Sequence, residues 1–222
     1  MAIFDTAYNN LHDRVQEAQT LVNAIKRNEA SKIYEDETKV LKGLFFVEVY
    51  GAIESCIRDC VTIGISHLNN LSLTVSELRP ELWALAFNPD CTRIEQNSEN
   101  KKWTNRNKLF VQLYGNNPIP GMDTSLFPTS IGNIKMGQIE GVWKTFGIKD
   151  PINPDITKGY DQTLSSIADG RMKIAHGRET STQVGATLTS AEVQKKLNDV
   201  DYYCSYVISC FEKYIANKDY IV

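Results

Sequence analysis

The chain has 222 residues, which is long enough for one large domain with a sizeable buried core. Hydrophobic residues make up 42% of the chain and charged residues 23%, close to the averages for soluble globular proteins, so a disordered or fibrous protein is excluded. The formal net charge of −3 excludes a protein that coats nucleic acid through bulk positive charge, because that mode needs many cations. Any nucleic-acid contact must therefore be local.

The sequence also predicts a cytoplasmic protein that does not enter membranes. Residues 1–10 lack the basic start, apolar run and cleavage site of a secretion signal. The longest apolar stretch, 44–65, contains four charged residues that a membrane-spanning helix would rarely carry. The five cysteines form no Cys-x-x-Cys framework, so we expect reduced thiols.

Two long helices are expected at the start of the chain. From 3 to 29, apolar residues recur every three or four positions with charged residues between them, which is typical of an amphipathic helix. A second helix is predicted from about 36 to 68. It begins with charged residues and is then apolar on nearly every side, so we expect other helices to surround it.

The region from about 71 to 130 predicts an irregular insertion, because it contains five prolines and an Asn-rich stretch. Two short helices are expected within it, near 76–87 and 101–114. The second combines Trp103 with several lysines and arginines, as a groove for single-stranded nucleic acid would. The pattern is more typical of an amphipathic helix whose tryptophan lies in the core, and we expect that arrangement.

Three further helices are expected in the last third of the chain. Residues 134–146 predict a short helix with a glycine cap, and 159–176 predict another. A polar loop over 178–187 leads to a capping box that begins at Thr189 and starts a final helix from about 191 to 216. No strand alternation or internal repeat is present. The sequence therefore predicts an all-α antiparallel helix bundle, a single domain over 1–222 with the insertion at 71–130.

Arg171 occupies an unusual position on the helix expected over 159–176. It falls in the middle of the apolar side, where a leucine would be expected. Burying a guanidinium is costly unless it is paired, so we expect Arg171 to face a polar partner or a cleft. His176 falls five residues later, in the final turn, and Gly177 supplies the helix stop.

The segment ADGRMKIAHG, with its Arg-x4-His spacing, resembles the signature of the HEPN superfamily, in which an arginine and a histidine end one helix of the bundle. The segments FFVEVYGAIESCIRDC, NIKMGQIEGVWKTFGI and TSAEVQKKLNDVDYYCSYVISCFEKYI resemble helices of the prokaryotic HEPN branch found in RNA-processing and antiphage operons. This resemblance implies a metal-independent endoribonuclease with Arg171 and His176 as catalytic residues. It also implies a toxin or effector role in a bacterial defence or toxin–antitoxin system.

The resemblance further implies a homodimer that binds RNA and needs no cofactor or metal. Cleavage by the RNA 2′-hydroxyl needs a base, an acid and positive charge, and two copies of the motif in one cleft would supply them. An antitoxin or another operon protein is a possible partner.

Several assignments around the motif stay open. Glu54 could orient His176 or Arg171, or it could simply pair with Arg58 one helical turn away. Lys173 and Arg178 are candidates for substrate phosphates, although such residues are often only solvated.

Two alternatives to catalysis at this motif also stay open. One is a non-catalytic module that binds RNA, a nucleotide or a partner protein, which Met172 favours because many catalytic members carry a polar residue there. The other gives Arg171 and His176 only structural roles, with the arginine paired to a core carboxylate. A zinc site at Cys56, Cys60 and His67 is a further possibility, less consistent with the spacing than buried thiols.

Overall fold

The computed structural model describes residues 3–31, 33–129 and 133–222. Within these ranges the chain is helical, with no strand and only two isolated antiparallel bridges, Thr74 to Pro118 and Leu78 to Ile221. The predicted all-α fold is confirmed. None of the described helices combines the length and the hydropathy needed to cross a membrane.

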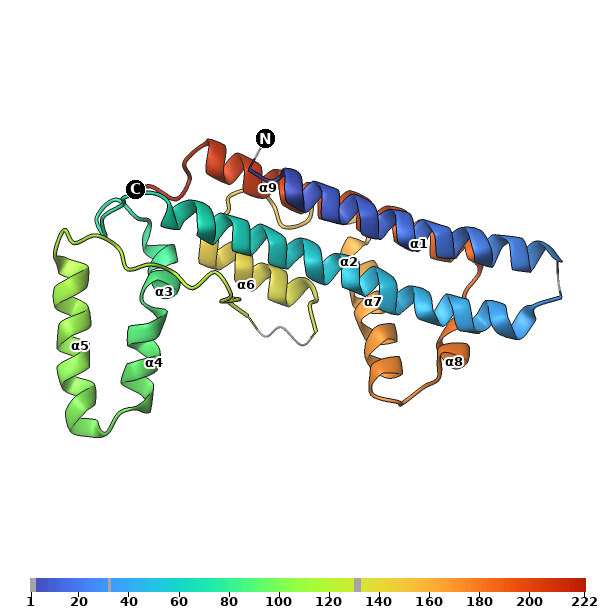
Figure 1. Cartoon of the computed structure of the whole chain (residues 1–222), viewed down its shortest axis with the longest axis horizontal. Coiled ribbons are helices and arrows are strands. Elements are labelled where there is room, and N and C mark those ends of the chain that lie inside the picture. Colours follow the sequence, from blue (N-terminus) through green and yellow to red (C-terminus); the bar gives the residue numbers. More distant parts are fainter. Residues whose placement is uncertain (1–2, 32, 130–132) are drawn as a thin grey trace.

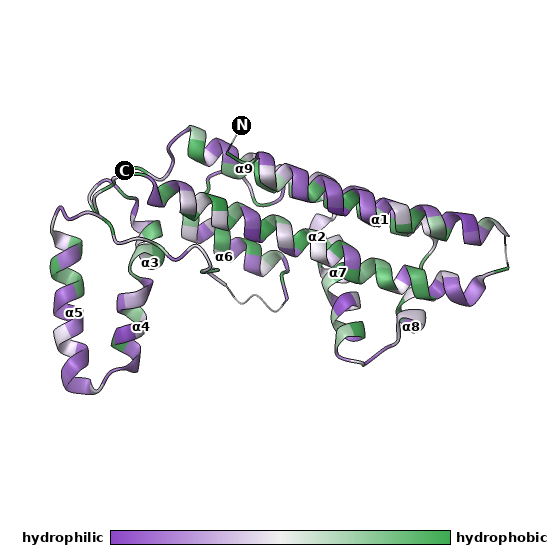
Figure 2. Cartoon of the chain, in the orientation of Figure 1, coloured by the Kyte–Doolittle hydropathy of each residue, from purple (hydrophilic) through white to green (hydrophobic). Residues whose placement is uncertain are grey.

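Three long helices form the body of the molecule: α1 (Asp5–Ser31), α2 (Glu35–Asn69) and α9 (Ser190–Ala216). They pack along one another, and α1 runs antiparallel to the other two (Figure 1). Apolar and polar residues alternate along α1 (Figure 2), as expected for a helix with one buried side. Apolar residues spaced three or four positions apart form a stripe on α9 that is buried throughout: Val193, Leu197, Val200, Cys204, Val207, Phe211 and Ile215.

Three shorter helices, α6 (Met136–Phe146), α7 (Tyr160–Ala175) and α8 (Ser181–Gly185), lie beside these long helices. The predicted cap of α6 is confirmed, since Gly147 adopts a left-handed conformation with φ +67°. The prediction of a loop over 178–187 was wrong, because α8 packs there directly against α2. A Cβ on Gly185 would lie 1.9 Å from the Lys39 carbonyl oxygen, so only glycine permits this backbone-to-backbone contact.

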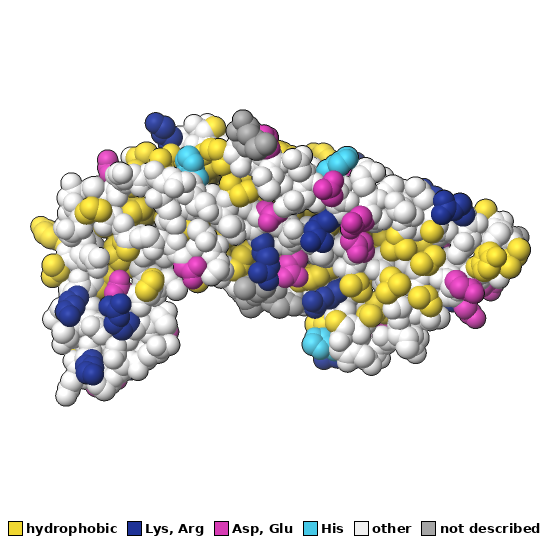
Figure 3. Space-filling model, in the orientation of Figure 1, with side chains coloured by type: hydrophobic (Ala, Val, Ile, Leu, Met, Phe, Trp, Pro, Cys, Tyr) yellow, Lys and Arg dark blue, Asp and Glu magenta, His cyan; other side chains and the backbone are white. Residues whose placement is uncertain are grey.

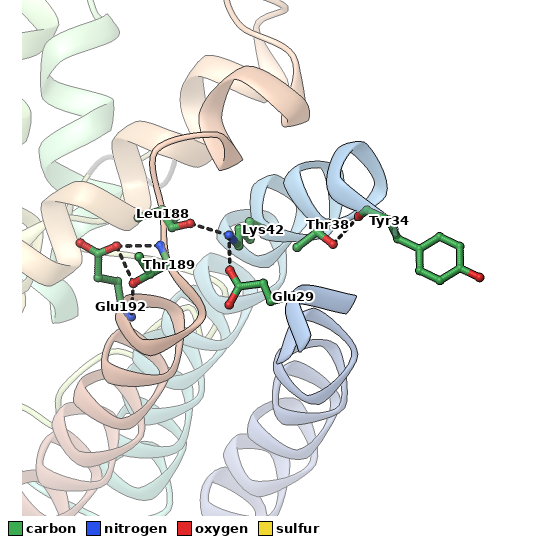
Figure 4. Close-up of polar contacts among 7 residues, drawn as sticks. All are labelled: Glu29, Tyr34, Thr38, Lys42, Leu188, Thr189 and Glu192. Carbon is green, nitrogen blue, oxygen red and sulfur yellow. Dashed lines mark hydrogen bonds and ion pairs between the residues drawn. The ribbon is translucent and has the colours of Figure 1, made fainter. Parts of the chain in front are cut away.

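Lys42 fixes the junction between α1, α2 and the start of α9 (Figure 4). Its ammonium lies 2.5 Å from the Glu29 carboxylate and donates a hydrogen bond to the Leu188 carbonyl at 2.5 Å. Next to it, the predicted capping box is confirmed. The Thr189 hydroxyl accepts from the Glu192 N–H, and the Glu192 carboxylate accepts from the Thr189 N–H. These contacts hold α8 and the chain leading into α9 against α2.

The insertion differs from its prediction in part. The helix expected near 101–114 is present as α5 (Glu99–Tyr114). The one expected over 76–87 is confined to η1 (Pro80–Leu82) and α3 (Trp83–Ala86), and it is followed by a helix that was not predicted, α4 (Asn88–Gln96).

We call α4 and α5 together the arm, because they project from the body as a hairpin (Figure 1) and contain no buried residue. The expected end of the insertion, residue 130, lies outside the described residues.

Candidate functional site

The helix α7 ends in a Schellman motif at Gly177, which has a left-handed φ of +64°. The Arg178 N–H donates to the Lys173 carbonyl at 2.9 Å, and the Gly177 N–H donates to the Ile174 carbonyl at 3.0 Å. The predicted helix stop is therefore confirmed. His176 is the C-cap residue, and its side chain is exposed. In the described part of the chain its ring makes no hydrogen bond or ion pair, so both ring nitrogens are open to solvent.

Gly170, which precedes His176 on α7, allows this part of the helix to lie close to α2. A Cβ on Gly170 would lie 2.5 Å from the ring of Phe46, which is 4% exposed and cannot move away freely. This close approach places the next residue, Arg171, over α2. Its guanidinium carbon lies 4.8 Å from the centre of the Tyr50 ring, which is the geometry of a cation–π contact.

Arg171 is half-buried, and no carboxylate among the described residues pairs with it. The alternative in which Arg171 binds a core acid is therefore wrong for the described chain. Its N–H donors remain available, because a cation–π contact uses the face of the guanidinium and not its edge. An arginine in this state can bind a phosphate through two N–H groups at once.

Tyr50 is a site residue that the sequence did not reveal. It is 2% exposed, and its hydroxyl accepts a hydrogen bond from the Ile134 N–H at 2.8 Å. A buried tyrosine needs a partner for its hydroxyl, and this one fixes the ring beneath Arg171. A tyrosine within a largely apolar stretch of α2 was the only available signal, and it does not indicate which residue the ring contacts.

Residues 133–135 hold the other flank of α7. The Lys135 ammonium lies 2.6 Å from the Asp169 carboxylate, and the Asn133 amide donates to the Met172 sulfur at 3.6 Å. Met172, the residue that follows the arginine, is thus half-buried in an intramolecular contact. Arg171 thus packs on Tyr50 of α2, while these contacts hold Asp169 and Met172 on either side of it in the sequence.

Comparison with protein families finds a match to the RiboL-PSP-HEPN model over residues 9–217. The chain belongs to the RiboL-PSP-HEPN family. The match includes the arm as well as the end of α7, so the resemblance to the HEPN superfamily is confirmed along nearly the whole chain. No curated protein and no solved structure matches the chain.

Glu54 and Lys173, which were also expected at this HEPN site, are each engaged in an ion pair. Glu54 forms an ion pair with Arg58 at 2.8 Å and, within the described ranges, makes no hydrogen bond or ion pair with Arg171 or His176. Lys173 pairs with Glu179 at 2.8 Å.

Arg178 is exposed, and its side chain has no acidic partner in the part of the chain that the structure describes. The structure thus gathers Arg171, Lys173, His176 and Arg178 at one end of α7, and it leaves Glu54 one helical turn beyond Tyr50 on α2.

The HEPN bundle also contains the cysteines considered for zinc. Cys56 and Cys60 are buried free thiols, and Cys56 donates to the Cys204 carbonyl at 3.6 Å. His67 instead packs edge-on against the Tyr220 ring at 5.9 Å. Among the described residues, no three His, Cys, Asp or Glu side chains are grouped so as to hold a metal ion. Buried thiols therefore describe these cysteines better than a zinc site.

Proposed function

We propose that this HEPN domain is a metal-independent endoribonuclease whose catalytic residues are Arg171 and His176. HEPN modules are generally of the ribonuclease type, which supports RNA as the substrate. The proposal rests on the surroundings of the Arg171 and His176 side chains. At the end of one helix, an arginine without an acidic partner in the described chain is followed five residues later by an exposed histidine.

The chemistry needs three groups around one phosphodiester. The 2′-hydroxyl oxygen attacks phosphorus while a base takes its proton. The bond from phosphorus to the 5′-oxygen breaks, and an acid protonates the leaving oxygen, so the products are a 2′,3′-cyclic phosphate and a 5′-hydroxyl. Arg171 stabilises the charge that develops on the phosphoryl oxygens, and His176 serves as a base or acid.

One copy of the site supplies one histidine, whereas the reaction uses a base and an acid together. In our proposal a two-fold homodimer supplies the second imidazole and a second guanidinium. An exposed apolar stripe on α2 supports this assembly: Val40, Leu44 and Val47 are 36%, 44% and 42% exposed. Figure 3 shows hydrophobic side chains gathered over this half of α2, next to α7. Such a patch is typical of an interface between proteins.

The remaining candidates have supporting roles in this proposal. Arg178 binds a flanking phosphate, because it is exposed without an acidic partner in the described chain, and Lys173 does so once it releases Glu179. Glu54 lies on the same side of α2 as the stripe, seven residues after Val47. We assign Glu54 as a positioning residue for the motif. The biological role that we propose is that of a cytoplasmic toxin or effector in a bacterial defence or toxin–antitoxin system, held by an antitoxin or operon partner.

The second candidate function is a non-catalytic module that binds RNA, a nucleotide or a partner protein through the same surface. The observation that favours it is the environment of Met172, whose sulfur is engaged by Asn133 and contributes no polar group beside Arg171. A gel-shift experiment separates the two functions, since a non-catalytic module would bind RNA and shift it on the gel without cleaving it.

The decisive experiment incubates the purified protein with RNA in the presence of EDTA. We expect cleavage that persists in the chelator and leaves a 2′,3′-cyclic phosphate. Replacing the nucleotide on the 5′ side of the cleavage site with its 2′-deoxy form removes the nucleophile and should abolish cutting. Arg171→Ala and His176→Ala should each lower the rate at least 100-fold, the order expected when a group that stabilises the transition state is removed.

Arg27→Ala and His12→Ala are matched controls, because both residues are exposed on α1, away from the end of α7. Both should cut RNA like the parent protein. Cleavage that EDTA abolishes, or that survives either motif substitution in a folded protein, would refute the proposal.

A further inference from the structure

The arm carries side chains that a helical hairpin would normally bury. On α5, Trp103 and Phe110 are each 64% exposed, Val111 is 72% exposed and Tyr114 is 97% exposed. The expectation that Trp103 lies in the core was wrong. Leu109 and Leu113 provide the apolar contacts of α5 with the rest of the protein, so the aromatic rings are not needed for its packing.

These aromatic residues form a row with a regular spacing. Trp103, Phe110 and Tyr114 are seven and four residues apart, so they lie on one side of α5. Lys101 and Lys108 are also seven residues apart, which gives the repeat Lys-x-aromatic at 101–103 and 108–110. At 1.5 Å per residue, each repeat advances about 10 Å along the helix. The two residues of each repeat lie about 160° apart around the helix, so a row of rings and a row of ammonium groups run along different sides of α5.

A hollow lined mainly by polar residues lies beside the row of lysines. A cavity of about 590 Å³ is lined by Thr104, Asn107, Lys108, Val111, Gln112 and Asn117. Amide and hydroxyl groups of this kind can donate to and accept from the edges of bases. Lys108 lines this hollow, whereas none of the three aromatic residues does.

The charges of the arm differ from those of the rest of the chain. Residues 88–114 hold five basic and three acidic residues, a net charge of +2 in a chain with a net charge of −3. Two of the acids are used within the arm, where Asp90 pairs with Arg93 and Glu99 pairs with Lys102. Among the described residues, Lys101 and Lys108 form no ion pair. Arg106 lies over the Trp103 ring, 5.0 Å from its centre, and its positive charge helps to lower the pKa of Glu99.

We propose that the arm is a binding platform for single-stranded RNA, in which bases stack on Trp103, Phe110 and Tyr114 while Lys101 and Lys108 bind the phosphates. Stacking on aromatic side chains combined with cations along the backbone is how proteins bind single strands without reading a sequence. The identification of the ligand as RNA rests on the proposed ribonuclease function. The arm and the corner between α7 and α8 project from the same side of the long helices (Figure 1), so one strand can contact both.

The test measures binding separately from cleavage. Fluorescence anisotropy follows a fluorescein-labelled 20-nucleotide oligo-U RNA with the full chain carrying His176→Ala, so that the RNA stays intact. In this background, Trp103→Ala with Phe110→Ala should weaken binding at least about tenfold. Lys101→Ala with Lys108→Ala should lower the slope of log affinity against log salt by about 1.4, since each phosphate contact on a single strand contributes about 0.7.

Matched controls are available on and off the arm. Lys102→Ala removes a lysine that is already paired with Glu99, and Ile156→Ala removes an apolar side chain that is 83% exposed elsewhere. Both should bind like the His176→Ala parent. An RNA duplex should bind more weakly than the single strand, because its bases are not free to stack.

Binding that is absent in the parent, or unchanged in both double variants, overturns the inference. So does self-association that depends on Trp103 and Phe110 without any effect on RNA, because the arm would then be an interface between copies. Failure of the proposed nuclease can be told apart from failure of the platform. Arm-dependent RNA binding without any cleavage would refute the nuclease and leave the platform standing. Cleavage that requires Arg171 and His176 but does not depend on the arm would refute only the platform.

Discussion

The Arg171 guanidinium lies over the ring of Tyr50, 4.8 Å from its centre, while the hydroxyl of the same tyrosine anchors the Ile134 N–H. Because the two contacts use different parts of Tyr50, we expect that mutation can separate the role of the ring from the role of the hydroxyl. Tyr50→Phe keeps the ring and leaves a buried N–H unpaired, so we expect a loss of about 1–2 kcal/mol in the free energy of unfolding. RNA cleavage at a temperature where the variant is folded should stay within about threefold of the parent rate, since the cation–π contact remains.

Tyr50→Leu is the matched variant that removes the ring as well. It should lose the hydroxyl contact and also lower the cleavage rate at least about tenfold, because Arg171 loses the surface that holds it. Urea unfolding and initial cleavage rates measure the two effects. Equal rates for the Phe and Leu variants would show that the ring does not position Arg171.

Gly170→Ala tests whether the close approach of α7 to α2 positions the motif. The added Cβ would lie 2.5 Å from the Phe46 ring, so α7 must move, and we expect a destabilisation of about 1–3 kcal/mol with reduced cleavage. Gly137→Ala is the control, because a Cβ there meets no atom within 4 Å and the residue lies in α6. It should be neutral or slightly stabilising, since alanine favours helix. Equal melting temperatures for the two variants would contradict this account.

The sequence predicts those parts of the fold that depend on local patterns. The amphipathic helix α1, the long apolar helix α2, the glycine stop at Gly177 and the capping box that starts α9 at Thr189 are all confirmed. The short helix α8 was missed because five polar and small residues carry no helical periodicity. Its helix depends on contact with α2 through Gly185, which is a tertiary effect. The helix α4 was missed for a similar reason, since Pro89 reads as a turn residue and here begins a helix.

The candidate site was also predictable only in part, because some of its residues come together only through tertiary packing. Arg171 and His176 lie in one contiguous segment, so spacing alone singles them out. Tyr50 lies 121 residues from Arg171 in the sequence and reaches it only because α2 and α7 pack together. The exposure of Trp103 was also beyond the sequence, because periodicity identifies one side of a helix without showing whether anything covers it.

Glu54 and Arg58 allow a test of whether Glu54 acts beyond its ion pair. The pair is half exposed, so breaking it should change the free energy of unfolding by less than about 1 kcal/mol. If Glu54 positions the motif, Glu54→Gln should lower the cleavage rate several-fold while Arg58→Ala leaves that rate near the parent value. Matching rate losses in the two variants would mean that Glu54 serves only to hold Arg58.

The ion pair between Lys42 and Glu29 predicts a pH-dependent contribution to stability. Burial alone would raise the pKa of Glu29, but hydrogen bonds from Lys42 and Ser190 outweigh it and lower the pKa below the ordinary value of 4.5. A carboxyl with a lowered pKa stabilises the fold at pH values above 4.5 and loses this contribution as the pH falls through its folded pKa. Glu29→Gln should therefore be less stable than the parent by about 1 kcal/mol at pH 7, and the difference should vanish as the pH falls below the folded pKa of Glu29.

Lys42→Met should cost more, roughly 2–3 kcal/mol at pH 7, because it removes the cation that pairs with Glu29 and leaves the Leu188 carbonyl without its donor. Urea unfolding of each variant between pH 2 and 7 measures these differences. A gap between Glu29→Gln and the parent that stayed constant over this range would show that ionised Glu29 does not stabilise the fold.

Leu44 tests the proposed dimer, because it lies in the middle of the α2 stripe and is 44% exposed in the single chain. A charge at an exposed position costs the monomer little, whereas at the centre of a two-fold interface it is buried next to its own symmetry mate. Leu44→Glu should therefore shift the sedimentation profile to monomer and lower the cleavage rate at least about tenfold, while the melting temperature at low protein concentration stays close to that of the parent. The control is Ile156→Glu, which places the same charge at an exposed apolar residue on η2 (Ile156–Lys158), away from the stripe, and should change neither mass nor rate. A Leu44→Glu protein that sediments as a monomer and still cuts RNA at the parent rate would show that one copy of Arg171 and His176 is sufficient.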